Sequence, residues 1–255
     1  MNSFDTFSQL HQNSTPLLLG NIWDVHSALL FEANGYKAIG TSSQAIAKTF
    51  GYEDGENIPF ETLFLIAKRV TEVVKIPFSV DLEGGYSRTI DGIIENITKL
   101  HAIGVAGINL EDSIPRTTRQ LQSIHEFQKT LSTIANHLNR NNMKVFLNIR
   151  TDGFLLGMET ALKETLSRLK SYEEAGANGI FVPCITQSND ISEVVKATAL
   201  PVNVMCMPTL PSFEDLQKLG VKRISMGPFT TMYVHKRAEE AIHSIQQNNS
   251  FSILF

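Results

Sequence analysis

The stretches Ile76-Pro-Phe-Ser-Val-Asp-Leu-Glu-Gly-Gly85 and Gly107-Ile-Asn-Leu-Glu-Asp112 decide how this chain folds. In each, a short apolar run typical of a buried strand ends in two carboxylates. If the runs are parallel strands, their carboxyl ends meet at one edge of the sheet and the acids enter one pocket. Several negative charges in one pocket are costly unless a cation lies among them. The sequence therefore predicts a divalent metal site.

The rest of the chain repeats the same alternation of short apolar runs and longer stretches with helical spacing. This pattern is typical of parallel strands joined by crossover helices. Eight strands, the number that closes a (β/α)8 TIM barrel, are predicted at residues 17–23, 38–42, 78–82, 107–110, 145–149, 179–182, 202–205 and 223–226. Helices are predicted between them at residues 60–74, 89–103, 123–138, 158–175, 188–198 and 212–219.

Two segments fall outside this count. A helix over residues 4–12 is expected to cover the barrel bottom, and residues 230–247 form a further helical segment after the last strand. We predict a single domain over residues 1–255. The alternative is an open doubly wound sheet, but it needs a glycine-rich phosphate turn that residues 20–24 do not supply.

Composition narrows the class of protein. The 255 residues are 42% hydrophobic with a formal net charge of -4, which is too mild to indicate a nucleic-acid partner. No stretch approaches the roughly 18 apolar residues of a membrane helix, and no signal peptide is evident. Cys184 and Cys206 form neither a disulfide framework nor a metal motif, as suits a reducing compartment. We expect a cytoplasmic protein without membrane or nucleic-acid partners.

The candidate site follows from the barrel, because chemistry in this fold lies just after each strand. Asp81, Glu83 and Glu111 stand at such positions on stiff strand ends, although any one of them could instead cap a helix. Mg²⁺ fits best, since it takes octahedral oxygen ligands with only one or two direct carboxylates. Zinc is disfavoured because no His/Cys cluster accompanies the acids.

Several motifs resemble those of the isocitrate lyase and phosphoenolpyruvate mutase superfamily. They lie at residues 21–28, 40–43, 50–54, 80–86, 107–112 and 148–152, and the likeness continues at 176–179, 201–204 and 220–225. The resemblance therefore covers nearly the whole chain in the right order.

This resemblance implies a Mg²⁺-dependent enzyme that binds a 2-oxo acid or its enolate, often as a tetramer that exchanges its final helix. By motif position the metal set is Asp81 innermost, with Asp54, Glu83 and Glu111 acting on the ion directly or through its waters. The substrate-binding set is Trp23, Ser42, Ser43, Gln44, Asp81, Arg150 and Asn203. The catalytic set is Arg150, Asp54 and Glu111.

The chemistry of these residue types agrees with that implication. A 2-oxo acid chelates a cation through its carboxylate and keto oxygens, and the cation stabilises the enolate that forms when a neighbouring bond breaks. Arg150 is predicted to bind the substrate carboxylate bidentately, or alternatively to form a structural salt bridge with Asp152 or Glu111.

Three further positions at the rim of the barrel each have both a functional and a purely structural interpretation. The turn at residues 41–43 either binds the enolate oxygen or simply caps a helix. His26 either transfers a proton or is a satisfied rim histidine, and Tyr86 either walls the pocket or packs beside it.

The loop after Asp112 departs from two patterns of the superfamily. It lacks the cysteine motif of isocitrate and 2-methylisocitrate lyases, and Cys184 and Cys206 follow later strands. Arg116 and Thr118 stand where the phosphonate-forming mutase has its lid lysine and asparagine, and Pro183 replaces the mutase histidine. The sequence thus favours a lyase or decarboxylase acting on a small, oxaloacetate-like 2-oxo acid through a metal-stabilised enolate.

Other functions stay open. They are a phosphonomutase acting on phosphoenolpyruvate or carboxyphosphonoenolpyruvate, a 2-methylisocitrate lyase-like enzyme and a non-catalytic ligand-binding barrel. The amphipathic stretch 230–245 and the apolar end 251–255 predict a homo-oligomer, a dimer or a tetramer, if they do not pack on their own barrel.

Overall fold

In the computed structural model, which describes residues 2–114 and 119–255, eight strands close into a parallel barrel. The order around the barrel is β1-β10-β9-β8-β7-β4-β3-β2, so β1 pairs with both β2 and β10. These strands are β1 (Leu17–Ile22), β2 (Ile39–Thr41), β3 (Phe78–Asp81), β4 (Gly107–Glu111), β7 (Phe146–Arg150), β8 (Gly179–Val182), β9 (Val202–Met205) and β10 (Arg223–Ser225). The predicted barrel is confirmed, and its closure excludes the doubly wound sheet.

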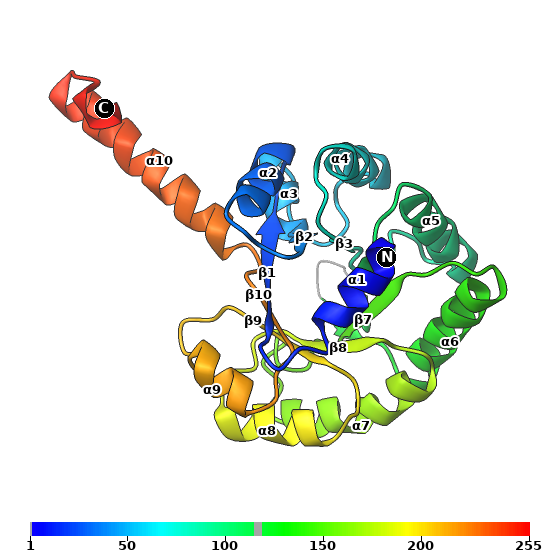
Figure 1. Ribbon diagram of the computed structural model, residues 1–255. Helices are drawn as coiled ribbons and strands as arrows, with labels where there is room; N and C mark the ends of the chain where they lie inside the picture. Colours follow the sequence, from blue (N-terminus) through cyan, green and yellow to red (C-terminus); the bar gives the residue numbers. More distant parts are fainter. Residues whose placement is uncertain (1, 115–118) are drawn as a thin grey trace.

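The helices lie around the barrel, except that the first covers its amino-terminal end and the last projects away from it (Figure 1). They are α1 (Ser3–Leu10), α2 (Val25–Ala33), α3 (Ser43–Thr49), α4 (Phe60–Val73), α5 (Ile90–Ala102), α6 (Ile124–Arg140), α7 (Ala161–Glu174), α8 (Ser188–Lys196), α9 (Phe213–Lys218) and α10 (Phe229–Asn248), with a short 3-10 turn at Ser252–Leu254. All six helices predicted between strands are confirmed within a few residues of their ends.

Sequence reasoning did not identify α2, α3 and a small hairpin formed by β5 (Ser113–Ile114) and β6 (Gln120–Leu121). Helix α2 is apolar on more than one face, so it has no stripe of helical period. Helix α3 has only seven residues, and each hairpin strand has two. Elements this short carry too few residues for a period to be recognised.

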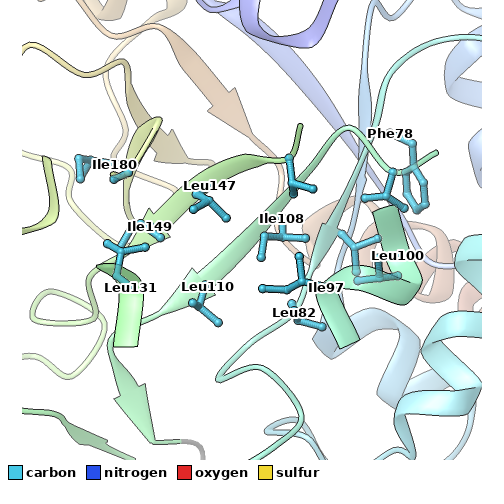
Figure 2. Packing of buried hydrophobic residues seen from close by; sticks show 14 of the residues in the cluster. Phe78, Leu82, Ile97, Leu100, Ile108, Leu110, Leu131, Leu147, Ile149 and Ile180 are labelled. Carbon is cyan, nitrogen blue, oxygen red and sulfur yellow. The ribbon is translucent and has the colours of Figure 1, made fainter. Parts of the chain in front are cut away.

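Strand alternation separates the apolar core from the polar barrel interior. In β4, Ile108 and Leu110 belong to the core that packs between the sheet and the helices, as Figure 2 shows. Asn109 lies on the opposite face, inside the barrel, and accepts a hydrogen bond from Asn148, its register partner on the neighbouring strand β7. Because successive side chains of a strand point to opposite faces, one strand serves both the core and the site.

Helix α1 covers the amino-terminal end of the barrel, as predicted (Figure 1). Its Phe7 is fully buried and packs edge-on against Phe146 at the start of β7. A Cβ at Gly107 would lie 3.0 Å from the Phe7 ring and 2.9 Å from Phe146 Cβ. Gly107 therefore leaves the space that α1 needs to pack against the start of the strand.

Helix α10 projects away from the barrel and carries the C-terminus at its tip (Figure 1). Of its 20 residues only Thr231 is buried, while Met232, Tyr233 and Ile242 are exposed. Large apolar side chains are thus left without cover on a helix about 30 Å long. Across the described ranges 2–114 and 119–255, no helix has the length and apolar character that spanning a membrane requires.

Candidate active site

A solvent-open cavity lies at the carboxyl ends of the barrel strands. Its volume is about 160 Å³, and since one water needs roughly 10–15 Å³ of such space, it has room for on the order of ten heavy atoms. The polar groups that line it are Asn21, Thr41, Ser42, Ser43, Gln44, Asp54, Asp81, Asn109, Arg119, Arg150 and Ser225. Carboxylates and guanidinium groups therefore face the same small space.

Asp81, at the end of β3, has one fixed and one unpaired carboxylate oxygen. Its Oδ2 accepts a hydrogen bond of 2.9 Å from Ser43 Oγ, and its backbone N–H donates to Thr41 Oγ1 at 2.7 Å. Its Oδ1 is buried and accepts no hydrogen bond from any described residue. A buried oxygen without a partner is costly, so it marks a place for a ligand.

Asp54 lines the same cavity from the loop after α3. Burial raises the pKa of its carboxyl group, and the negative charge of Asp81 raises it further. The two acids are therefore close enough to repel each other.

Glu83 is buried behind the cavity and is held by the neighbouring loop. Its Oε1 accepts from Tyr86 Oη at 3.0 Å, and its Oε2 accepts from the Glu56 N–H at 3.0 Å. Burial raises the pKa of Glu83 well above its ordinary value, and Asp54 and Asp81 raise it further. Glu83, Glu56 and Tyr86 all have positive φ angles, of 49°, 59° and 54°. Such strain at linked residues is typical of functional loops.

Glu111 lies beside Arg150 because parallel pairing of β4 with β7 sets these two residues in register. Arg150 Nη1 is 2.9 Å from Glu111 Oε2, and Arg119 Nη1 contacts Glu111 Oε1. Burial nevertheless raises the pKa of Glu111 against the opposing effect of both guanidinium groups. Glu111 is thus a buried acid enclosed by two cations.

Arg150 directs its bidentate edge at Asp152. Its Nε donates to Asp152 Oδ1 at 2.6 Å and its Nη2 donates to Oδ2 at 3.1 Å. Burial opposes ionisation of Asp152, but Arg150 outweighs it and lowers the pKa of that carboxyl group. The predicted alternative, a salt bridge of Arg150 to Asp152 and Glu111, is present, while Arg150 also lines the cavity.

Asp152 is held in place by a buried hydrogen-bond network centred on Asp112. Asp112 Oδ1 accepts the Asp152 N–H at 3.1 Å, and its Oδ2 accepts from Tyr172 Oη at 2.8 Å and from Arg168 Nη1 at 3.2 Å. Burial raises the pKa of Asp112 to about 6, although Arg168 opposes the shift. This network connects α7 to the strand end that carries Arg150.

The comparison with known proteins agrees with this geometry. Residues 7–246 match the family model described as phosphoenolpyruvate phosphomutase. The chain belongs to this family. The resemblance to the isocitrate lyase and phosphoenolpyruvate mutase superfamily is therefore confirmed.

The proteins to which this chain is similar have different names. An uncharacterized protein of Mycobacterium tuberculosis (strain H37Rv) is 32% identical over 95% of this chain and 90% of its own. The oxaloacetate decarboxylase of a Bradyrhizobium strain is 26% identical over 80% of this chain and 70% of its own. A Burkholderia cenocepacia crystal structure, provisionally named a phosphonomutase, is 33% identical with a TM-score of 0.89, covering 94% of this chain and 99% of its own.

Among the residues predicted for substrate binding, the structure brings together Ser42, Ser43, Gln44, Asp81 and Arg150 around the cavity. Ser42 Oγ also accepts the Ala45 N–H at 3.4 Å, so it is a helix cap as well as a cavity residue.

Trp23 and Asn203 do not line the cavity. Trp23 is half-buried and packs on the apolar core. Asn203 is buried within the barrel and donates to Ser225 Oγ at 3.0 Å. His26 is exposed on α2 and lies outside the cavity lining.

The four acids predicted for the metal occupy two layers. Asp54 and Asp81 line the cavity, whereas Glu83 and Glu111 lie behind it with protein partners. Within residues 2–114 and 119–255, no three His, Cys, Asp or Glu side chains form a direct metal-ligand set. Mg²⁺ needs only one or two direct carboxylates and keeps several waters. The unpaired Oδ1 of Asp81 beside Asp54 therefore fits this ion.

The main residue that sequence reasoning missed is Arg119, which lines the cavity from the segment that precedes β6. A signal was present, because Arg119 belongs to the loop after Asp112 that departs from the superfamily patterns. Arg116 and Thr118, the two residues of this loop compared with the mutase lid, lie outside the described residues.

Proposed function

We propose that this protein is a Mg²⁺-dependent lyase or decarboxylase that acts on a small, oxaloacetate-like 2-oxo acid. The proposal rests on one observation: the buried Oδ1 of Asp81, which has no hydrogen-bond partner among the described residues, lies in a cavity that Arg150 and Arg119 also line. A buried carboxylate oxygen without a hydrogen-bond donor is a favourable ligand for a cation. Guanidinium groups bind carboxylates. The similarity to the oxaloacetate decarboxylase of a Bradyrhizobium strain supports the substrate class.

Asp81 would hold Mg²⁺ directly with Asp54 beside it, and Glu83 and Glu111 would act through the ion's waters. When bound, Mg²⁺ supplies Lewis-acid chemistry that polarises a keto oxygen and offsets negative charge developing there. Ser43 fixes the orientation of Asp81 through its hydrogen bond to Oδ2. Glu83 and Glu111 lie behind the cavity and leave it open for the substrate.

The other cavity residues bind and orient the substrate. Arg150 attracts a substrate carboxylate by its charge and its remaining N–H bonds, because Asp152 holds its bidentate edge. Ser42 and Gln44, which follow β2, supply neutral donors to the same cavity. Fixed donors of this kind stabilise charge at a reacting oxygen without reorganisation.

For an oxaloacetate-like substrate, the bond from C3 to its carboxylate breaks and CO2 leaves. The electron pair passes to the keto oxygen, which gives the enolate of pyruvate, and a proton added at C3 gives pyruvate. Asp54, a carboxyl group that lines the cavity, would deliver that proton. The 2-oxo acid product then leaves the cavity.

The test is release of CO2 and pyruvate from a panel of dicarboxylic 2-oxo acids, measured with Mg²⁺ and after chelation with EDTA. We expect turnover only with the metal. A wild-type protein that releases neither product from any member of the panel would refute the proposal. Tight ligand binding without turnover would instead favour a binding barrel.

A phosphonomutase is the second candidate. It is favoured by the description of the matching family model and by the provisional name of the Burkholderia cenocepacia structure. Phosphorus NMR of the protein with phosphoenolpyruvate and with phosphonopyruvate decides, because the mutase reaction changes a P–O bond into a P–C bond. Interconversion of these two compounds would replace the lyase proposal.

We also propose that the protein is a homo-oligomer in which α10 covers a second copy. The exposed Met232, Tyr233 and Ile242 on this projecting helix support the proposal. Light scattering after size exclusion should give a multiple of the 28.3 kDa chain mass. Ile242→Lys should lower that multiple, whereas Glu240→Gln on the same helix should leave it unchanged. A wild-type protein of single-chain mass would contradict this assembly.

A further inference from the structure

Arg119 and Arg150 line the same cavity but use their guanidinium groups differently. Arg150 donates from Nε and Nη2 to Asp152, and its Nη1 pairs with Glu111. Arg119 reaches Glu111, Ser113 and Asp152 through Nη1 in every case. Among the described residues, none accepts a hydrogen bond from its Nε or Nη2. The Nε–Nη2 edge of a guanidinium group can bind a carboxylate bidentately. This edge is occupied by Asp152 in Arg150, and it has no partner among the described residues in Arg119.

The charges of the cavity lining indicate the charge of the ligand. Two carboxylates, Asp54 and Asp81, oppose two guanidinium groups, Arg119 and Arg150, so the described lining is neutral. A divalent cation at Asp81 makes the lining +2. A dianion neutralises that charge, whereas a monoanion leaves one cation uncompensated.

The positions of these groups separate the two ends of such a dianion. Ser43 and Asp81 come from the β2–β3 side of the barrel, while Arg150 ends β7 and Arg119 precedes β6. The two guanidinium groups share Asp152, which holds them beside each other. Because Arg119 is 17% exposed, its side chain is anchored but can be reached from the cavity.

We infer that Arg119 is the receptor for the second carboxylate of a dianionic substrate and sets the preference for dicarboxylic over monocarboxylic acids. This inference rests on the proposed function, since it names the substrate class of the same site. Arg119 acts by direct contact with the distal carboxylate. Asp152 and Glu111 hold its Nη1 in place and leave its Nε–Nη2 edge for the ligand.

The experiment compares binding of L-malate and L-lactate to the full chain with Mg²⁺, measured by titration calorimetry. The two hydroxy acids differ by one carboxylate, and neither is a 2-oxo acid that decarboxylates through an enolate. We expect the wild type to bind malate at least about 10-fold more tightly, the value of a charge-assisted hydrogen bond. Arg119→Gln should remove this preference and leave lactate affinity unchanged.

Two further variants separate the geometry of Arg119 from its charge. Arg119→Lys keeps the charge but loses the bidentate edge, so it should retain only part of the preference for malate. Arg69→Gln removes the same charge from the exposed surface of α4 and should behave as the wild type. Circular dichroism and the melting temperature establish that each variant is folded.

The inference is overturned by a wild type that does not prefer malate, or by Arg119→Gln weakening both acids equally or neither. An equal effect of Arg69→Gln would also overturn it, since bulk charge would then explain the result. Malate preference that depends on Arg119, without turnover of any 2-oxo acid, would refute the proposed function alone. Turnover with an Arg119-independent preference would refute this inference alone.

Discussion

The two ends of the barrel bury ionisable side chains in different surroundings. At the carboxyl ends of the strands, acids are crowded together, and burial raises the pKa of Asp54, Glu83 and Glu111. At the amino-terminal end, His11 is stacked on Phe146 at 4.4 Å between ring centres, and burial lowers its pKa to about 3. Burial favours the neutral form at both ends, but the first end gathers several acids and arginines around one cavity, whereas the second packs an imidazole ring against an aromatic side chain.

This difference separates function from stability. Like charges held together cost free energy, and they persist where a ligand or ion offsets the cost. Aromatic packing around a neutral ring instead stabilises the fold directly. Substitutions at the carboxyl-terminal end should therefore change activity more than stability, and substitutions at the amino-terminal end should do the reverse.

The largest expected effect is at Asp81. Asp81→Asn keeps the size of the side chain but removes the charge that the proposed Mg²⁺ needs. Turnover of the best 2-oxo acid should fall on the order of 10³-fold, since metal stabilisation is worth several kcal/mol. Steady-state kinetics measures the loss, and Asp91→Asn, on the exposed start of α5, is the matched control. Full activity in Asp81→Asn would contradict the assignment of function to the carboxyl-terminal end of the barrel.

The next effect tests the opposite end. Phe7→Ala removes a fully buried ring from the packing of α1 on Phe146. The free energy of unfolding should fall by about 3–5 kcal/mol, as for other buried aromatic residues. Denaturant unfolding measures this, and kcat of the folded fraction should stay within about twofold. A large drop in kcat at unchanged stability would contradict the division between the two ends.

The smallest effect is a pH dependence that arises from His11. The ordinary pKa is 6.5 and the folded value is about 3, so below pH 6.5 the unfolded chain binds a proton that the folded chain does not. Stability present above pH 6.5 is therefore lost as the pH falls toward 3. Relative to His11→Gln, the wild type should lose about 2 kcal/mol between pH 6.5 and 4.5.

Urea unfolding of both proteins across this pH range isolates the histidine, because other titrating groups contribute equally to each. Arg223 adds to the lowering of the histidine pKa from inside the barrel. Parallel pH profiles for the wild type and His11→Gln would show that this ring is not held neutral.

The barrel and the position of the acids could be predicted from the sequence. Short apolar runs identified β3 and β4, and their ends located Asp81 and Glu111 at one rim. These features depend on neighbours within a few residues, so local pattern carries them. The short hairpin of β5 and β6 lacked such a pattern and was missed.

Only the tertiary structure decided which partner each charged side chain has. Arg150 pairs with Glu111 through strand register, and Arg119 meets Asp152, which lies 33 residues away. Glu83 faces Glu56 rather than the cavity because of the conformation of a loop. Sequence determines the period and the place of each residue on its strand, because those follow from local backbone geometry. Pairing between distant side chains depends on register, loop path and rotamer, which are fixed only when the whole chain packs.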